Sequence, residues 1–229
     1  MTIGDRINRI EERIEAACRR CGRRREELRL MGVSKFHSLR EVEEAFAGGI
    51  RLFGENRVQE GVKKFESLKA LHPGPEIHLI GSLQRNKVLA AAAFFDCIQS
   101  VDRDPLLEEL GKAAAERKEP LPILLEFHTG EASKSGYPDR ESLFRAAEKA
   151  LSFPALRLTG LMTMAPFTDS EGEIRASFRS LTEARRELEK RFPGYWSCLS
   201  MGMTNDFEIA IEEGSTLLRI GTAVFGERT

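Results

Sequence analysis

The chain has 229 residues, 41% of them hydrophobic and 31% charged, so it is long enough to bury a core of ordinary size. Its 35 basic and 36 acidic side chains give a net charge of −1, which excludes a global field that would attract nucleic acid or an anionic membrane. No apolar run approaches the roughly 18 residues of a membrane span, and residues 1–20 are amphipathic rather than a signal peptide, so we expect a cytoplasmic protein.

The four cysteines predict neither a disulfide framework nor a metal site. Cys97 and Cys198 stand in apolar, strand-like contexts, which favours buried thiols in a chain of this size. Cys18 and Cys21 form a CxxC pattern, but no second pair of cysteines or histidines follows at ligand spacing. We therefore expect no bound metal.

Strand and helix patterns alternate along the chain after an opening helix, which is predicted from apolar residues at helical spacing between Ile3 and Cys18. The predicted strands are Leu28–Ser34, Ile50–Phe53, Ile77–Ile80, Cys97–Val101, Leu121–Phe127, Leu156–Met164, Trp196–Ser200 and Thr216–Ile220. The predicted helices between them are Ser38–Ala47, Val58–Leu71, Arg85–Phe95, Pro105–Arg117, Arg140–Leu151, Glu171–Phe192 and Asn205–Glu213. Each helix is long enough to connect two parallel strands.

This alternation predicts an α/β fold with a parallel sheet. Eight strand–helix units in a chain of this length favour a (β/α)8 TIM barrel, with an extra N-terminal helix, over an open doubly wound sheet. The absence of GxGxxG and GxxxxGK[ST] patterns also weakens the nucleotide-binding interpretations of an open sheet. No linker-like or low-complexity segment divides the chain, so we expect residues 1–229 to form a single domain.

Two loops at the end of the chain predict a phosphate site. Segment Ser200–Asp206 combines a hydroxyl, a glycine and a helix-capping residue before a helical pattern, which exposes backbone N–H groups to an anion. Gly221 and Thr222 follow the eighth strand, and loops seven and eight form the usual phosphate site of these barrels. The glycines could instead only permit turns, and Thr204 or Asn205 could only cap a helix. Their occurrence in adjacent loops favours phosphate.

Lys35 and Arg219 are charged residues at the end of a predicted strand and inside an apolar run, where a charged side chain is unusual. Lys35 directly follows the first predicted strand, and a desolvated amine at a strand end loses its proton readily, as a carbonyl-condensing lysine must. A surface lysine at the start of a loop is the alternative. Arg219 lies inside the apolar run TLLRIGTAVFG, where its guanidinium needs an acceptor. That acceptor is either the ring nitrogen of a pyridine or a buried carboxylate.

Several segments carry a resemblance to a known family, in chain order from about Leu30 to Arg228. They are GVSKF, FGENRVQE, IHLIGSLQRNK, SVDR, GEASKSG, GLMTMAPF and LSMGMTNDFEIAIEEGSTLLRIGTAVFGER. Together they resemble the pyridoxal 5′-phosphate homeostasis protein family, the stand-alone relative of the alanine racemase N-terminal barrel. The last segment is the most specific of them.

The resemblance implies a pyridoxal 5′-phosphate (PLP) held as an internal aldimine on Lys35, with Arg219 facing the pyridine nitrogen. The other cofactor-binding residues that it implies are Asn56 and His78 near the ring, and Ser200, Met201, Gly202, Gly221 and Thr222 at the phosphate. The chain departs from the family pattern at Ile77 and Ser82 in the third-strand segment, and at Phe127 and His128 before a loop that is one residue shorter. We therefore expect a different shape for that loop, which Ser133, Lys134 and Ser135 would help to form.

An arginine opposite the pyridine nitrogen disfavours its protonation and weakens the ring as a sink for carbanion charge. The related racemases also add a second domain whose tyrosine is the opposing base, and we expect no such domain after this barrel. Tyr137 is a weak substitute, and Tyr195 falls at the start of a strand, on the wrong face. We therefore expect a monomeric PLP carrier or buffer with little or no catalysis, whose recipients are PLP-dependent apo-enzymes. A PLP-dependent amino-acid racemase with Lys35 as one base is the alternative.

A third interpretation is nucleic-acid binding through the basic cluster that ends the first helix. The cluster comprises Arg19, Arg20, Arg23, Arg24 and Arg25. No aromatic residues are interleaved with these arginines and the net charge is close to zero, so a solvated helix face is favoured and nucleic acid is not expected as a partner.

Overall fold

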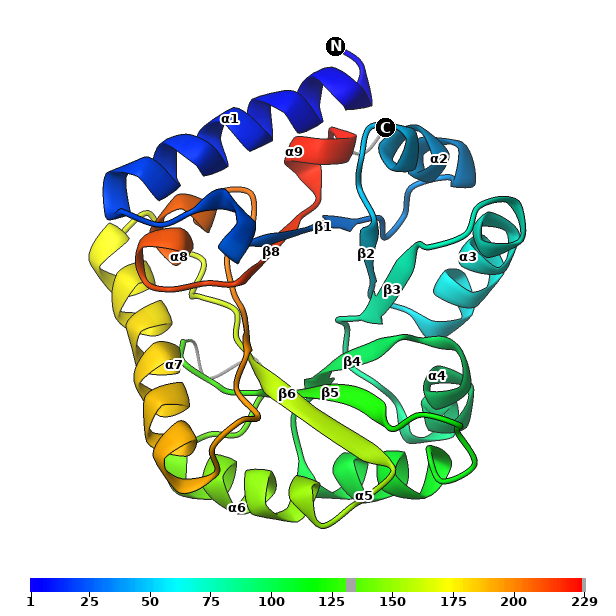
Figure 1. Ribbon diagram of the computed structural model, residues 1–229, viewed down its shortest axis with the longest axis vertical. Helices are drawn as coiled ribbons and strands as arrows, with labels where there is room; N and C mark the ends of the chain where they lie inside the picture. The colour runs from blue at the N-terminus through cyan, green and yellow to red at the C-terminus, as the bar shows by residue number, and fades with distance from the viewer. Residues whose placement is uncertain (131–134, 228–229) are drawn as a thin grey trace.

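Eight parallel strands pair in chain order, and the eighth pairs with the first, so the sheet closes into a barrel (Figure 1). The computed structural model describes residues 1–130 and 135–227. The strands are β1 (Arg29–Val33), β2 (Leu52–Glu55), β3 (Glu76–Leu79), β4 (Cys97–Val101), β5 (Leu121–Glu126), β6 (Leu156–Met162), β7 (Cys198–Ser200) and β8 (Leu217–Ile220). The predicted α/β TIM barrel is confirmed.

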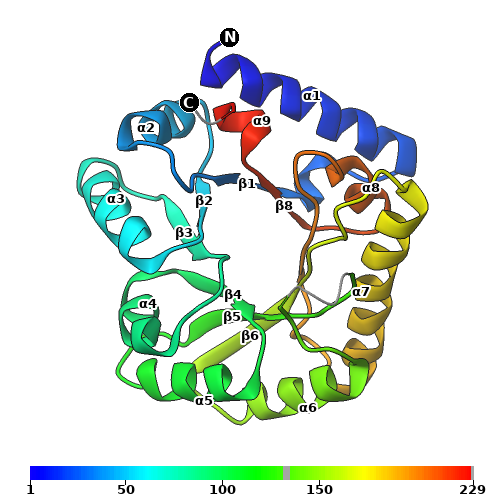
Figure 2. The same ribbon diagram turned by 180° about the vertical axis from the view of Figure 1, so that it is seen from behind.

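Helices cover the outside of the barrel, and Figures 1 and 2 show them as a ring around the strands. They are α1 (Ile3–Cys21), α2 (Leu39–Ala47), α3 (Val58–Leu71), α4 (Val88–Phe94), α5 (Asp104–Ala113), α6 (Arg140–Leu151), α7 (Glu171–Arg191), α8 (Phe207–Glu212) and α9 (Thr222–Phe225). Two short 3-10 helices, η1 (Arg25–Glu27) and η2 (Arg85–Lys87), precede β1 and α4. Neither η1 nor α9 was predicted, because three or four residues are too few to show a helical period.

Two strand and helix boundaries differ from the prediction in ways that matter for the site. Strand β2 extends to Glu55 rather than ending at Phe53, because Gly54 and Glu55 pair with β3 even though a charged residue is atypical of a strand. Helix α8 begins at Phe207 rather than at Asn205, which leaves Asn205 and Asp206 in the preceding loop. In both cases backbone pairing and loop packing override the local pattern.

Helix α1 lies against α8 and α9 on the outside of the barrel (Figure 1). Its N-terminus has a capping box between Thr2 and Asp5, and Gly22 ends it with a left-handed φ of 71°. The basic cluster is engaged with the protein. Arg23 donates to the carbonyl oxygens of Ile211 and Ser215 at 2.9 and 2.7 Å, and Arg20, Arg25 and Arg19 pair with glutamates. Arg20 and Arg23 therefore attach the end of α1 to the α8 region, whereas Arg19 and Arg25 pair with Glu15 and Glu11 of α1 itself.

Apolar side chains fill two layers of the barrel. The larger one lies between the strands and the helices, and its largest fully buried members are Trp196, Phe53, Phe65, Phe95, Phe178 and Phe207. Inside the barrel, Met31, Val33, Leu52 and Leu217 form one small cluster, and Cys97, Leu124 and Met162 form another. Strands β2, β4 and β8 are buried along their whole length, as expected for parallel strands covered on both faces.

The four cysteines are free thiols, and Cys18 and Cys97 are buried. Among the described residues, no group of three or more histidine, cysteine or acidic side chains is arranged to hold a metal ion. In the same part of the chain, no helix is long and apolar enough to cross a membrane.

A buried ion pair holds the ends of β1 and β2 together. Lys64 of α3 donates to the Oε1 atom of Glu55 and to the carbonyl oxygen of Ser34, both at 2.8 Å. The Ser34 hydroxyl donates to the same Glu55 oxygen at 2.8 Å, whereas the Oε2 atom of Glu55 is buried without a hydrogen-bond partner. Burial raises the pKa of the Glu55 carboxyl, which makes this carboxylate dependent on the Lys64 ammonium.

We predict that Lys64→Met lowers the free energy of unfolding by about 3 kcal/mol, because it leaves a buried carboxylate without its cation. Urea denaturation measures the loss. Lys63→Met, which changes the exposed neighbour in the same helix, is the matched control and should cost little. The double variant Glu55→Gln/Lys64→Met should recover most of the stability, and a double variant as unstable as Lys64→Met would contradict this explanation.

Candidate functional site

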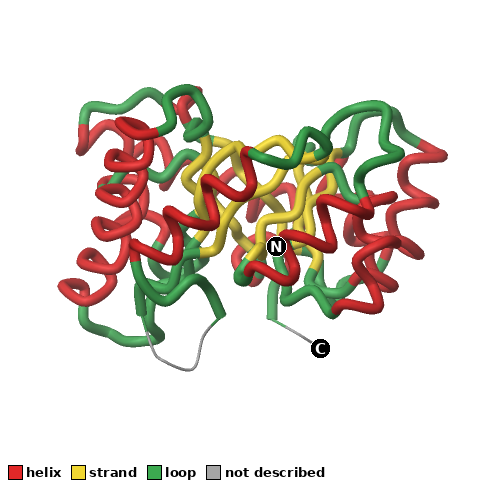
Figure 3. The backbone as a smooth tube through the Cα atoms, turned by 90° about the horizontal axis from the view of Figure 1, so that it is seen from below, coloured by secondary structure: helices red, strands yellow, loops and turns green. Residues whose placement is uncertain are grey.

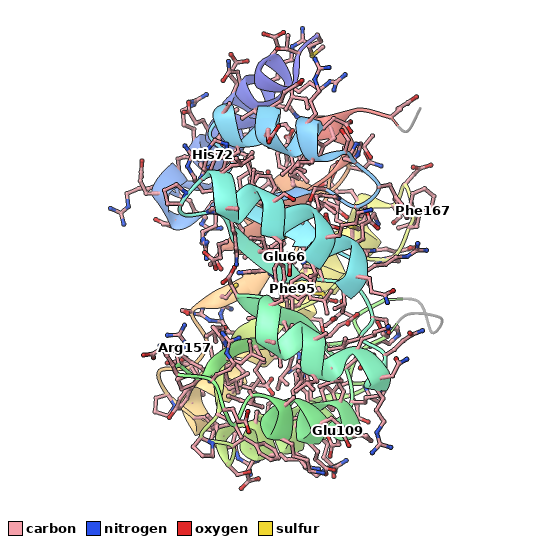
Figure 4. The ribbon with its side chains drawn as sticks, turned by 90° about the vertical axis from the view of Figure 1, so that its right-hand side faces the viewer. Glu66, His72, Phe95, Glu109, Arg157 and Phe167 are labelled. Carbon is pink, nitrogen blue, oxygen red and sulfur yellow. The ribbon has the colours of Figure 1, made fainter. Side chains whose placement is uncertain are left out.

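A cavity of about 510 Å³ opens at the end of the barrel where the strands finish. Figure 4 shows Phe167, which follows β6, at this end and Arg157, the second residue of β6, at the opposite end. In the side view of Figure 3, loops form both ends of the barrel around the strands. The cavity is lined by Val33, Lys35, Asn56, Ile80, Gly81, Ser82, Glu126, Ser135, Met162, Met164, Ala165, Pro166, Phe167, Met203, Thr204, Asn205, Asp206, Arg219, Gly221 and Thr222.

Lys35 lines this cavity from the turn after β1 and is half-buried. The turn is tightly held. The next residue, Phe36, has a left-handed φ of 68°, which is uncommon for a side chain of this size, and its N–H donates to Glu60 Oε1 at 2.7 Å. The preceding residue, Ser34, is held by the Glu55–Lys64 ion pair. Lys35 therefore projects from a backbone that is fixed on both sides.

Asn56 lines the cavity from the loop after β2. Its backbone packs against Gly81 of the next loop so closely that a Cβ atom on Gly81 would lie 2.3 Å from the Asn56 oxygen. Glycine is therefore required at position 81, and the two loops form one continuous wall. Ser82, one of the departures from the family pattern, is part of this wall, whereas Ile77 packs in the outer core.

Arg219 points from β8 into the barrel and contributes to the floor of the cavity, although only 4% of its surface is exposed. Its Nη1 donates to the Ser200 hydroxyl and its Nη2 to the carbonyl oxygen of Thr163, both at 2.7 Å. Both acceptors are neutral. Burial lowers the pKa of Arg219, although Asp206 and Glu126 lie near enough to oppose the shift. Of the two acceptors considered for Arg219 from the sequence, the buried carboxylate is therefore not the one observed.

The seventh loop lines the cavity later in the chain than predicted. Ser200, Met201 and Gly202 are buried and do not line it, whereas the four residues from Met203 to Asp206 do. Gly202 makes the sharp turn between these segments, with φ of 98°, and an added Cβ would lie 2.6 Å from Ala210 Cβ. Asp206 accepts a hydrogen bond from Met203 N at 2.5 Å, which closes the loop.

Gly221 and Thr222 line the cavity from the eighth loop, as predicted. The N–H of the next residue, Ala223, lies 3.4 Å from the Thr204 hydroxyl oxygen, which joins the seventh and eighth loops. The two predicted phosphate segments therefore do meet in space, and residues 203–206 and 221–222 are their cavity-lining members.

His78 does not lie with the other predicted residues. It is buried inside the barrel on β3, with Nε2 2.6 Å from Glu76 and Nδ1 2.7 Å from Gln99. It lines a second cavity of about 390 Å³, which Arg29 and Arg157 also line at the opposite end of the barrel. The structure thus separates His78 from the cavity that holds Lys35.

Glu126 was not predicted, yet it lines the cavity at the end of β5 with 2% of its surface exposed. Burial raises the pKa of its carboxyl, and the Ser135 hydroxyl donates to its Oε1 at 2.7 Å. An acidic residue closing the apolar run LPILLE was the signal that could have identified it. Ser133 and Lys134, expected to shape this loop, lie outside the described residues.

Tyr137 is held beside the end of β5, where it forms a parallel bridge with Phe127. Tyr137 N donates to Glu126 O at 2.8 Å, and His128 N donates to Tyr137 O at 3.0 Å. The Tyr137 ring is buried, its hydroxyl lies 3.2 Å from Asp104, and burial raises the pKa of its phenol. Neither Tyr137 nor Tyr195 lines the cavity that holds Lys35.

This geometry can be compared with known proteins. The family model described as alanine racemase, N-terminal domain, matches residues 6–229. A pyridoxal phosphate homeostasis protein of Aquifex aeolicus (strain VF5) is 40% identical over 228 residues, which cover 100% of this chain and 99% of that protein. The structure of PipY of Synechococcus elongatus PCC7942 with PLP bound is 33% identical, with a TM-score of 0.85, and the match covers 98% of this chain and 100% of PipY.

An alanine racemase of Clostridium difficile 630 shares the fold alone, with 12% identity and a TM-score of 0.76. The match covers 96% of this chain but only 56% of that racemase. The motif resemblance is therefore confirmed over the full length by relatives of similar length. The chain belongs to the alanine racemase N-terminal domain family and, within it, to the pyridoxal phosphate homeostasis proteins.

Proposed function

We propose that this protein binds PLP in the cavity at the C-terminal end of the barrel through Lys35, and that it stores and hands on the cofactor with little or no catalysis. The observation that carries the proposal is the presence of the Lys35 amine and the fixed Arg219 guanidinium in one cavity. The full-length similarity to PipY, whose structure contains PLP, and to the pyridoxal phosphate homeostasis protein of Aquifex aeolicus supports it.

The chemistry of the lining residues fits PLP. Arg219 has five N–H groups, of which two donate to described residues, so others remain for a ring nitrogen. The segments 203–206 and 221–222 supply the polar surface for an anionic group at the usual phosphate position of a barrel. The apolar side chains of Val33, Ile80 and Met162 supply a surface for a flat ring.

Each polar group has a separate task in this proposal. When bound, PLP supplies an aldehyde that condenses with an amine. Lys35 is the amine, and the fixed turn around it limits where its nitrogen can lie. Asn56 borders the ring, and Thr204, Gly221 and Thr222 hold the anionic end. Ser200 acts indirectly, by accepting from Arg219, and Met201 and Gly202 act through the shape of the loop.

Arg219 makes the site better suited to holding the cofactor than to catalysis. The pyridine nitrogen would accept from a guanidinium, which cannot transfer a proton to it at ordinary pH. Without a protonated ring nitrogen, negative charge on a substrate carbon is poorly stabilised. The racemase alternative also needs a second base across the substrate, and neither tyrosine reaches the cavity.

We infer further that the protein acts as a monomer in the cytoplasm and that PLP-dependent apo-enzymes receive its cofactor. Four free thiols suit a reducing compartment. Exposed Phe167 and Met203 line the cavity, and an open entrance suits exchange of the bound molecule. Gel filtration of the protein alone and with a PLP-dependent apo-enzyme tests the monomer and the transfer.

We predict that Lys35→Ala abolishes the visible absorption of the protein–PLP complex, because Lys35 is the lysine that lines the cavity in the described ranges 1–130 and 135–227. Borohydride treatment of the wild-type complex, followed by peptide mapping, should label position 35. Lys87→Ala changes a lysine of the neighbouring groove and is the matched control. Labelling elsewhere with position 35 unmodified would overturn the proposed function.

Because neither tyrosine lines the cavity, we predict that PLP-saturated protein does not sustain racemisation of any of the common amino acids. Chiral chromatography of L- and D-amino acids incubated with the complex measures this. Turnover should stay far below the ~1 per second that is typical of enzymes at the slow end. A rate at or above that value would favour the racemase alternative.

The Glu126 carboxyl predicts a pH dependence of stability. Burial raises its pKa above the ordinary value of 4.5, so its contribution to stability is complete below that value and is lost as pH rises through the raised pKa. Glu126→Gln keeps the acceptor for Ser135 but removes this titration. As the pH rises from about 4 to 8, the free energy of unfolding of Glu126→Gln should therefore increase relative to that of the wild type. A difference that does not change with pH would contradict this assignment.

A further inference from the structure

Buried polar side chains form a continuous chain inside the barrel, starting at Arg219. The Arg219 Nη1 atom lies 2.7 Å from Ser200 Oγ, which lies 2.6 Å from Gln99 Oε1. The Nε2 atom of Gln99 lies 2.7 Å from Nδ1 of His78, whose Nε2 is 2.6 Å from Glu76 Oε1. Four strands, β8, β7, β4 and β3, contribute the members. The chain connects the cavity of Lys35 with the second cavity at the other end of the barrel.

The central members are shielded from water. Gln99 and Ser200 have no exposed surface, and 4% of the surface of Arg219 and of His78 is exposed. In such surroundings each donor and acceptor must be satisfied within the protein, and an unmatched group is costly. Once one hydrogen position among these five side chains is known, the donor or acceptor character of each neighbour determines the others.

The acidic end of the chain sets the tautomer of His78. The hydrogen bond from His78, aided by Arg29, lowers the pKa of Glu76 to about 2, so its carboxylate only accepts. The His78 Nε2 atom must therefore carry a hydrogen. Because the amide nitrogen of Gln99 only donates, Nδ1 of His78 must be an acceptor, and the imidazole is neutral.

The same logic continues to Arg219. With its nitrogen committed to His78, Gln99 presents its oxygen to Ser200 and accepts the hydroxyl hydrogen. The Ser200 oxygen then presents a lone pair to Arg219. The reversed Gln99 orientation would need a doubly protonated His78 and would remove the Gln99 oxygen that accepts the Ser200 hydroxyl hydrogen. Each hydrogen bond in the observed chain thus points the same way, from Arg219 towards Glu76.

We propose that Gln99 and His78 are positioning residues for Arg219: by fixing the direction of the Ser200 hydroxyl, they hold the guanidinium in one orientation towards the PLP ring. This inference rests on the proposed function, because it assigns Arg219 to the ring nitrogen. It gives His78 a role in cofactor binding without contact with the cofactor. It also explains why a neutral amide and a histidine are buried where apolar residues would pack without cost.

The direction of these hydrogen bonds can be tested directly in the wild-type protein. Nitrogen-15 NMR of the imidazole groups should show His78 as the neutral tautomer with hydrogen on Nε2, with or without PLP. Hydrogen on Nδ1, in a neutral or a charged ring, would overturn the proposal whatever the fate of Lys35. This measurement needs no variant and does not depend on cofactor binding.

Variants test the effect on binding. Gln99→Leu should raise the Kd for PLP about threefold to tenfold, the loss of roughly one net hydrogen bond. Lys35 should still be labelled at saturating PLP, which separates this result from failure of the proposed function. His78→Leu should have a similar effect, whereas His78→Asn should stay within about twofold of wild type because its amide oxygen can accept from Gln99 in place of Nδ1.

Thr182→Val is the matched control for losing a buried hydrogen bond, since the Thr182 hydroxyl donates to the carbonyl oxygen of Glu213, outside the barrel. It should lower stability without changing the Kd for PLP. Equal PLP affinity in Gln99→Leu and wild type, or equal losses in His78→Asn and His78→Leu, would contradict a positioning role.

Discussion

A guanidinium buried inside the barrel, satisfied by neutral oxygens, is the interaction on which the site depends. Arg219 is almost fully buried, and its acceptors, Ser200 Oγ and Thr163 O, carry no charge. A carboxylate partner would neutralise the cation and occupy its N–H groups. The two neutral acceptors leave the guanidinium at the floor of the cavity without a hydrogen-bonded carboxylate among the described residues, although Asp206 and Glu126 lie near it. Arg219 is held by Ser200 of β7 and by Thr163, which follows β6. The polar side chains behind Ser200 support this arrangement.

The two ends of the barrel carry different features. Loops at the C-terminal end supply the amine, the hydroxyls and the apolar lining of the main cavity, as in barrel enzymes generally. The other end carries the Arg29–Glu76 ion pair and receives the polar chain from Arg219. In our proposal, the orientation of Arg219 in the Lys35 cavity therefore depends on residues that a ligand in that cavity does not touch.

The proposed roles of Lys35 and Arg219 suit a protein that stores a reactive aldehyde. Lys35 would hold the molecule, and Arg219 would transfer no proton to its ring, which restricts side reactions. Phe167 and Met203 leave apolar surface exposed at the cavity. Binding and release, rather than turnover, are what this arrangement favours.

The sequence by itself determined the alternation of strands and helices, the barrel, and the placement of Lys35, Asn56, Arg219, Gly221 and Thr222 at one end, because strand ends and apolar runs are local signals. The family and the identity of the cofactor came from the motifs, not from periodicity. Only the tertiary structure decided that Met203–Asp206 and Glu126 line the cavity, that Ser200 acts behind Arg219, and that His78 lies apart from the ligand. Those outcomes depend on which side chains meet across the barrel, and a contact such as that between Ser200 and Gln99, 101 positions apart, leaves no local trace in the sequence.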